Sequence, residues 1–300
     1  MTTSSGLLLL DKGPGLTSHD CVALVRKLFN ERRVGHAGTL DPLATGLLIL
    51  GVGTSTRLLR FAQSEVKRYG GSVMLGIATD SLDADGEVTD EQPVPALTPE
   101  TMTAAAAAML GTQQQTPPMV SAIKIDGQRL HKLARQGVEV ERAPREIKVS
   151  DFTLSPTDDP LVWQFEVACS VGTYVRVLLS DLAQRVGTVG HLVALRRLSS
   201  GSHRVDDART IEQLTEDVAN GETVLLPPAA FVTALEHVTL SDEQIRAVRM
   251  GQRVTLTGEY ANEEIAAMDS DGALVGVLKR RNDSWKPEVV LSAIGETMSR

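Results

Sequence analysis

Apolar and polar positions near the start of the chain predict two buried strands with a helix between them. Residues 7–10 and 47–52 are short apolar runs, and runs of this length are typical of buried strands. Between them, Thr17 is followed three residues later by Asp20, which is the pattern of a capped helix start. Apolar residues then recur at helical spacing, so we expect a helix there.

The rest of the pattern predicts a mixture of helices and antiparallel strands. Residues 69–77 and 163–169 alternate between apolar and polar side chains, which indicates half-buried strands. Residues 98–111 begin with threonine and proline, continue as an alanine run and end in glycine, which is typical of a helix. Because strands and helices do not alternate regularly, we predict an α+β fold with a mainly antiparallel sheet. Short strand patterns at the C-terminal end predict a second, β-rich domain, which divides the chain into residues 1–230 and 231–300.

Residues 112–150 differ from the rest of the chain in charge. This segment carries seven basic and four acidic residues, whereas the whole chain of 300 residues has a formal net charge of −8. Its start, residues 113–118, cannot continue a helix because it contains two prolines, and we expect a short helix near residues 128–136. A local basic segment can bind phosphates even in an acidic protein. A solvated surface excursion is nevertheless the commoner explanation.

The composition predicts a globular protein of the cytoplasm. With 42% hydrophobic residues, the chain can bury a sizeable core. Its two cysteines, Cys21 and Cys169, are too few for a disulfide framework and suit a reducing compartment. The apolar run at residues 7–10 is too short for a signal peptide or a membrane span, so we expect no membrane contact.

Metal and nucleotide chemistry is poorly supported. The sequence contains no His-Glu-x-x-His motif, no phosphate-binding P-loop and no clustered cysteine and histidine ligands. Residues 83–87 faintly resemble a calcium loop, but the third acidic position and the closing glutamate are missing.

One carboxylate, Asp41, lies in a segment whose composition is suited to presenting a side chain. Gly35 and Gly38 precede it, Pro42 follows it directly, and Gly46 comes five residues later. Glycine permits backbone conformations that other residues avoid, and proline biases the preceding residue toward an extended conformation. An Asx-type turn explains an aspartate before proline equally simply, and on spacing alone we favour that turn.

The longer string around Asp41 changes this interpretation. Residues 33–46, Arg-Val-Gly-His-Ala-Gly-Thr-Leu-Asp-Pro-Leu-Ala-Thr-Gly, resemble the signature of the bacterial tRNA pseudouridine-55 synthases, the TruB family. Further strings resemble motifs of this family and follow in the expected order: Asp11-Lys12-Gly-Pro-Gly-Leu-Thr17-Ser18, Lys67-Arg-Tyr69, Asp83-Ala-Asp-Gly86, Gln115-Thr-Pro-Pro118, Ser121-Ala-Ile-Lys124, Ala134-Arg-Gln-Gly137, Gly172-Thr-Tyr-Val-Arg176 and Leu195-Arg-Arg197. The resemblance extends over roughly residues 7–205.

The resemblance implies a fold, a reaction and a partner. It implies a pseudouridine-synthase catalytic domain in residues 1–230, in which the basic segment is an RNA-gripping insertion, and a PUA-like domain in residues 231–300. The reaction breaks the C1′–N1 bond of uridine 55 in the T-loop of tRNA, rotates the base and rejoins C1′ to C5. It needs no cofactor. The implied partner is the T-arm of tRNA, and no obligate protein partner is inferred.

The resemblance also implies roles for individual residues. Asp41 would act on the ribose, either by attacking C1′ or by assisting loss of the 2′ proton. Tyr69 would stack on the flipped uracil and could take the C5 proton, and Arg176 would pair with the ionised Asp41. The residues expected to contact the substrate or support its pocket are His36, Asp83, Tyr174, Leu195, Lys12 and Lys124.

Within the basic segment, two departures from the family pattern stay open, and so do two other functions. Val120 and His131 stand where the family usually has tyrosines, which affects the expected packing of the insertion. Taken singly, these side chains also fit ordinary structural roles, such as core packing for Leu195 or a surface position for Arg176. The chain could instead be a tRNA-binding or RNA-folding protein with secondary catalysis, or a carboxylate enzyme that hydrolyses free nucleosides.

Overall fold

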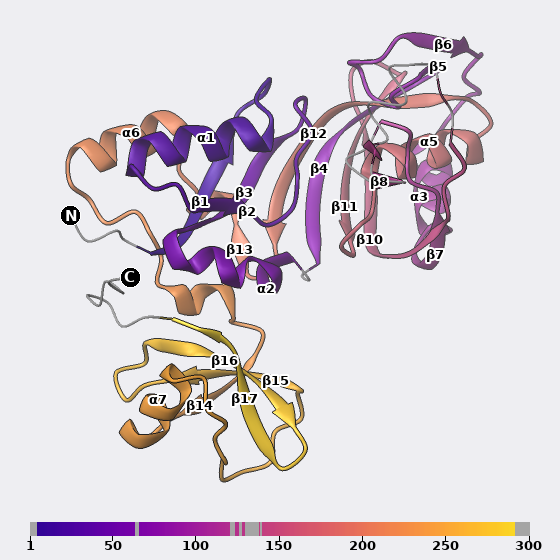
Figure 1. Cartoon of the computed structure of the whole chain (residues 1–300). Helices are drawn as coiled ribbons and strands as arrows, with labels where there is room; N and C mark the ends of the chain where they lie inside the picture. Colours follow the sequence, from indigo (N-terminus) through magenta and orange to yellow (C-terminus); the bar gives the residue numbers. More distant parts are fainter. Residues whose placement is uncertain are drawn as a thin grey trace. The chain divides into compact units, whose positions relative to one another are not determined.

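The computed structural model describes residues 5–63, 66–120, 124–125, 128–129, 138 and 140–291. The chain forms two compact units, and Figure 1 labels most of their helices and strands. The first unit combines Met1–Pro42, Leu47–Ser64 and Ser202–Arg300, and the second combines Leu43–Gly46 with Glu65–Gly201.

The N-terminal part of the first unit follows the hydrophobic pattern. β1 (Gly6–Lys12) is the neighbour of β3 (Thr45–Val52), and β2 (Val34–His36) pairs with β3 in antiparallel orientation. The predicted helix is α1 (Ser18–Phe29), and it begins with the predicted capping box. The unit also contains η1 (Gly53–Leu58), α2 (Leu59–Gln63), β13 (His203–Arg204), η2 (Val205–Asp207), α6 (Ile211–Ala219) and η3 (Pro228–Phe231).

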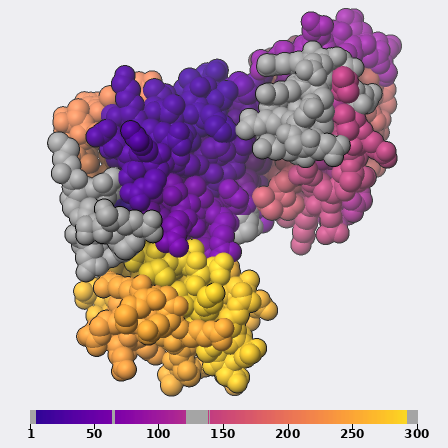
Figure 2. Space-filling model, viewed as in Figure 1, coloured from indigo at the N-terminus to yellow at the C-terminus, as the bar shows by residue number. Residues whose placement is uncertain are grey.

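The C-terminal part of the first unit is rich in strands, as predicted. β14 (Glu236–Thr239), β15 (Glu264–Met268), β16 (Leu274–Arg281) and β17 (Ser284–Val290) form a four-stranded sheet in this order. Only the β14–β15 pair is parallel. The helix α7 (Asp242–Arg249) also begins with a capping box, which Ser241 and Gln244 form. Figure 2 shows the same view as a space-filling model, in which this C-terminal part is coloured orange to yellow. The domain boundary at residue 230 and the PUA-like assignment stay predictions.

The second unit is built on five long or medium strands in the order β12, β4, β11, β10 and β7, and each adjacent pair is antiparallel. At one edge, Thr45 and Gly46 of β3 pair in parallel with Arg196 and Arg197 of β12. The α+β prediction with a mainly antiparallel sheet is therefore confirmed. The strands and helices of this unit are β4 (Lys67–Leu75), β5 (Ile77–Thr79), β6 (Val88–Glu91), α3 (Pro99–Ala107), β7 (Gly111–Gln115), β8 (Lys124–Ile125), β9 (Gln128–Arg129), β10 (Arg145–Pro156), β11 (Val162–Cys169), α5 (Val175–Arg185) and β12 (Gly190–Ser200).

The helix expected near residues 128–136 is wrong at its first two positions. Residues 128–129 form β9, which pairs with β8 in antiparallel orientation. In the sequence, the Asp-Gly pair at positions 126–127 is typical of a hairpin and competes with the helical pattern. The remainder of the expected helix lies outside the described residues.

Candidate active site

Asp41 lies in the loop between β2 and β3, and the residue before it is held by a buried hydroxyl. The N–H of Leu40 donates to Ser18 Oγ at 2.8 Å, and Ser18 Oγ donates to the carbonyl of Leu40 at 3.1 Å. Ser18 and Leu40 are both buried, whereas the Asp41 side chain is half-buried. The loop therefore presents a partly exposed carboxylate from an anchored backbone.

The residue after Asp41 is anchored as well. The carbonyl of Pro42 accepts a hydrogen bond from the Gly15 N–H at 2.9 Å and another from Lys12 Nζ at 3.3 Å. Lys12 Nζ also donates to the carbonyls of Gly13 and Leu16, and the Lys12 side chain is fully buried. These hydrogen bonds show that Lys12 supports the loop from within. Its expected contact with the substrate stays a prediction.

His36 is the last residue of β2 and belongs to the same unit as Asp41. Its side chain is half-buried, and its ring meets the ring of His19 on α1 edge to face, with 5.4 Å between the centroids. The pairing of two rings in this geometry orients the His36 imidazole. Its expected role in filling the space of the flipped base stays a prediction.

In the second unit, Tyr69 on β4 faces a buried arginine on the neighbouring strand. Tyr69 and Arg197 are directly paired across the β4–β12 ladder, and directly opposite residues share one face of a sheet. Arg197 Nε donates to the Tyr69 hydroxyl oxygen at 3.3 Å, and its guanidinium carbon lies 5.5 Å from the ring centroid. Both side chains are buried. The phenol is therefore held in place by a cation.

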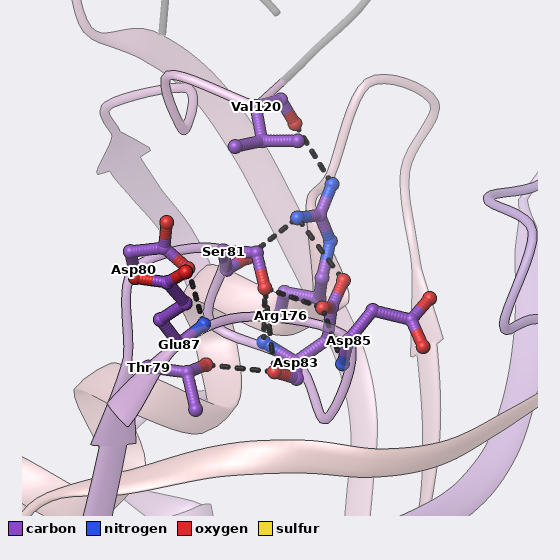
Figure 3. Close-up of polar contacts among 8 residues, drawn as sticks. All are labelled: Thr79, Asp80, Ser81, Asp83, Asp85, Glu87, Val120 and Arg176. Atoms are coloured by element: carbon purple, nitrogen blue, oxygen red, sulfur yellow. Dashed lines mark hydrogen bonds and ion pairs between the residues drawn. The ribbon is translucent and has the colours of Figure 1, made fainter. Parts of the chain in front are cut away.

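Arg176, in the first turn of α5, is at the centre of a buried network that Figure 3 shows in close-up. Its guanidinium pairs with Asp83 Oδ2 at 3.3 Å and donates to the carbonyls of Ser81 at 2.6 Å and Val120 at 3.0 Å. Arg176 is only 3% exposed. The surface position that a lone arginine would suggest is therefore wrong. The predicted pairing of Arg176 with Asp41 stays a prediction.

Asp83 is held by the same hairpin that presents it to Arg176. Its Oδ1 accepts hydrogen bonds from the Ser81 hydroxyl and from the N–H of Asp85, and its carbonyl accepts one from the Thr79 hydroxyl. Asp83 is buried and is therefore not an exposed loop aspartate. The structure thus brings Asp83 and Arg176 together as an ion pair, because a turn stabilised by side-chain hydroxyls aims the carboxylate at the guanidinium.

Tyr174 is positioned by a residue that the sequence did not indicate. The side-chain amide of Gln115, at the end of β7, donates to the Tyr174 carbonyl at 3.1 Å and accepts from the Tyr174 N–H at 2.8 Å. The guanidinium of Arg145 lies 5.4 Å from the centroid of the Tyr174 ring. Because Tyr174 is the capping residue of α5, this amide also fixes the start of the helix that carries Arg176.

The last expected substrate contacts are Leu195 and Lys124. Leu195 is buried on β12, and its carbonyl accepts a hydrogen bond from the Thr45 hydroxyl at 3.4 Å. The backbone of Lys124 belongs to β8, but its side chain lies outside the described part of the structure, as does His131. Val120, the other departure from the family pattern, contacts Arg176 through its carbonyl, so this contact does not depend on the side chain at that position.

The comparisons with known proteins agree with the motifs. A family model described as "TruB family pseudouridylate synthase (N terminal domain)" matches residues 26–175. The "tRNA pseudouridine synthase B" of Psychrobacter cryohalolentis is 41% identical over 265 residues, which are 86% of this chain and 74% of that relative. The chain belongs to the TruB family. It is therefore an RNA pseudouridine synthase, an isomerase.

Other relatives of the TruB family extend the match over nearly the whole chain. The "tRNA pseudouridine synthase B" of an Arthrobacter species is 38% identical over 304 aligned positions, which cover 97% of this chain and 98% of that relative. Among solved structures, a Cbf5-Nop10-Gar1 complex contains a chain that is similar in fold, with a TM-score of 0.73 and 23% identity, over 95% of this chain and 84% of that one. An H/ACA RNP bound to a substrate RNA containing 2′-deoxyuridine contains another, with a TM-score of 0.74 and 20% identity, over 97% and 86%.

Three residues that hold predicted site residues of this TruB-family chain, or their direct neighbours, were not singled out from the sequence: Ser18, Gln115 and Arg197. Each lies inside a motif string, but each acts on a residue that is distant along the chain, between 22 and 128 positions away. The alternation of strand side chains offers a signal for one of them. Arg197 lies two positions after Leu195, so it belongs to the same face of β12.

The described residues offer little other chemistry. They contain no group of three or more His, Cys, Asp or Glu side chains that could hold a metal ion. Burial raises the pKa of Cys169 to about 11, although the Thr173 side chain, Lys67 and Arg197 act in the opposite direction. The thiol is therefore neutral at physiological pH and is a poor nucleophile. No helix in the described ranges has the length and apolar character needed to cross a bilayer.

Proposed function

We propose that this enzyme converts uridine 55 in the T-loop of tRNA to pseudouridine. The observation that carries the proposal is the segment around Asp41, which matches the family model and holds a partly exposed carboxylate on a backbone anchored at both sides. The relatives named tRNA pseudouridine synthase B support tRNA as the substrate, because one of them aligns over almost its whole length.

In the proposed reaction, Asp41 acts on the ribose of a uridine that has left the base stack. The C1′–N1 bond breaks and its electron pair goes to the uracil ring. The detached uracil then rotates, C5 forms the new bond to C1′, and the C5 proton is lost while N1 is protonated. No atom is added, so no co-reactant is needed. Asp41 acts either as a nucleophile at C1′ or by assisting loss of the 2′ proton, and a carboxylate has precedent in glycosyl chemistry.

We propose that Tyr69 acts on the uracil base and that Arg176 compensates the negative charge of Asp41. Tyr69 would stack on the uracil and accept the C5 proton, and its phenol is already oriented by Arg197. The family model supports joining Tyr69 and Asp41 in one reaction, because its match includes the segments that carry both residues. Arg176 would supply the cation that keeps a desolvated carboxylate ionised.

The remaining residues would bind the RNA and line the pocket. His36 would occupy the space that the flipped base leaves, while Tyr174 and Leu195 would form the pocket wall. Lys124 and the other basic residues of the segment 112–150 would contact phosphates. Flipping a base costs a few kcal/mol of unstacking, and phosphate contacts offset this cost. Asp83 would act through Arg176, because the two form an ion pair.

The test is the substitution Asp41→Asn, which keeps the size of the side chain and removes its charge. We expect no pseudouridine in a T-arm transcript incubated with this variant, while its affinity for the transcript stays within about twofold of the wild type, since phosphate contacts dominate affinity. Pseudouridine at position 55 is measured by release of tritium from C5-labelled uridine and by mapping of the modified position. Normal turnover by the Asn variant would contradict the catalytic role of Asp41.

Two other outcomes correspond to other functions. If the Asn variant fully restores the growth and tRNA quality of cells that lack the enzyme, RNA binding or folding is the main role and catalysis is secondary. If the wild type releases uracil from free uridine and leaves tRNA unmodified, the enzyme is a nucleoside hydrolase.

A further inference from the structure

We propose that Ser18 is a positioning residue for Asp41. The proposal rests on the proposed function, because it assumes that the Asp41 carboxylate acts on the substrate. It concerns a different question, namely which side chain outside the loop sets the orientation of that carboxylate.

The hydroxyl of Ser18 does not serve the helix to which it belongs. Ser18 is the first residue of α1, and a serine at the start of a helix commonly caps its own backbone N–H groups. Here Thr17 does this instead, since its Oγ1 accepts from the N–H of Asp20 at 3.1 Å. Ser18 Oγ contacts Leu40, which is 22 residues away in the chain.

Ser18 satisfies both backbone groups of Leu40 at once. A hydroxyl has one donor and two acceptor positions, so it can donate to the Leu40 carbonyl and accept from the Leu40 N–H. Ser18 is 1% exposed and Leu40 is 3% exposed. Water cannot easily replace a hydroxyl at such a place, and buried backbone groups need a partner. Removing the hydroxyl therefore frees the Leu40 peptide groups to turn toward other partners.

The fixed carbonyl of Leu40 determines how the chain enters Asp41. It belongs to the peptide bond between Leu40 and Asp41, so the hydrogen bond from Ser18 fixes the plane of that peptide. On the other side, the carbonyl of Pro42 is held by Gly15 and Lys12, and the proline restricts the backbone of Asp41 to extended conformations. Hydrogen bonds therefore fix the backbone on both sides of Asp41, and Ser18 provides those on the N-terminal side.

A shift of the Asp41 backbone would affect turnover more than binding. A misplacement of about 1 Å in a reacting group can cost on the order of 100-fold in rate. Affinity for RNA depends mainly on phosphate contacts, which a displaced carboxylate does not alter. Ser18→Ala should therefore lower kcat by about 10- to 100-fold and leave KM for a T-arm transcript within about twofold.

Thr17→Ala is the matched control. It removes one hydrogen-bonding hydroxyl from the adjacent position of the same helix end and destabilises α1. Thr17 is exposed, and its hydroxyl bonds to the side chain and the N–H of Asp20, a residue of its own helix. We expect Thr17→Ala to lower the melting temperature at least as much as the loss of a helix cap usually does. Its kcat should stay within about twofold of the wild type. A loss of kcat that is equal in the two variants would show that Ser18 acts only through stability, and would overturn the proposal.

Two further substitutions keep the proposal testable if Ser18→Ala folds poorly. Ser18→Thr retains the hydroxyl and should restore most of kcat, whereas Ser18→Cys keeps the size but has a weak donor and acceptor and should fall between Thr and Ala. Activities are compared well below the melting temperature of each variant. A kcat for Cys equal to that for Thr would overturn the proposal. If the wild type does not modify the transcript, the proposed function fails; if it does and Asp41→Asn does not, only the role of Ser18 is at stake.

Discussion

Arg176 brings a positive charge into the interior of the second unit, where a charge is tolerated only if it is paired and hydrogen-bonded. The partners that meet this requirement include the carboxylate of Asp83 and the carbonyls of Ser81 and Val120. The carbonyls come from the hairpin before β6 and from the start of the basic segment. The guanidinium therefore ties together three parts of the chain that are distant in sequence.

Asp83→Asn should be strongly destabilising. Removing one partner of a buried ion pair weakens the compensation of the other charge, and the free energy of unfolding should fall by about 3 kcal/mol. The substitution should also lower turnover, because the position of Arg176 depends on the pair. Urea unfolding and kcat on a T-arm transcript measure the two effects.

Asp85→Asn is the control for that substitution, since Asp85 is exposed on the same hairpin and contacts Asp83 only through its backbone N–H among the contacts described. Its effect on the free energy of unfolding should stay within about 0.5 kcal/mol. Equal effects of the two substitutions would mean that the charge of Asp83 does not stabilise Arg176.

At the scale of the elements, the periodicity of the sequence was sufficient for most strands and helices. The apolar run at residues 7–10 became β1, the alternating residues 163–169 became β11 within one position, and Thr17 caps α1 as expected. These features depend on neighbouring residues. The strand order and the partners of Ser18, Gln115 and Arg197 depend on residues far apart in the chain, so local patterns could not predict them. The motif strings identified the family, but they did not show which side chains form hydrogen bonds with the predicted site residues or their neighbours.

Gly46 shows how β3 meets β12. It has a φ of +95°, and a Cβ built on it would lie 2.4 Å from the carbonyl oxygen of Arg197. The close approach of the two backbones therefore requires glycine here.

Gly46→Ala should disturb both stability and activity. The added methyl group meets backbone, which cannot swing away, and the positive φ is unfavourable for alanine, so we expect a loss on the order of 3 kcal/mol in the free energy of unfolding. Turnover should fall as well, because Arg197 orients Tyr69. Gly13→Ala is the control, since Gly13 has no heavy atom within 4 Å of a built Cβ and a negative or extended φ. Similar melting temperatures for the two variants would show that the strands can separate without cost.

At the scale of the whole molecule, the chain is acidic, with a formal net charge of −8, and a uniform charge of this sign would oppose binding of RNA. Affinity for a polyanion depends on where the positive charge lies and not on the sum. The segment 112–150 has three more basic than acidic residues, while residues 211–300 have seven more acidic than basic ones. The first of these segments is therefore the better candidate for phosphate contacts, and the excess negative charge elsewhere would repel RNA that approaches in other orientations.

Replacing Lys124 and Arg129 by glutamine should weaken binding of a T-arm transcript and reduce its dependence on salt. Each lost phosphate contact lowers the slope of log affinity against log salt by roughly 0.7 to 0.9, so two contacts should lower it by about 1.6. The control replaces two exposed arginines outside the segment, Arg185 and Arg204, by glutamine and changes the net charge equally. If the electrostatic field of the whole protein governed binding, both double variants would lose the same affinity for the transcript. The slope of log affinity against log salt would then be the same for both. A lower slope for the Lys124 and Arg129 variant alone would instead show direct contacts, because only a released counterion changes the slope.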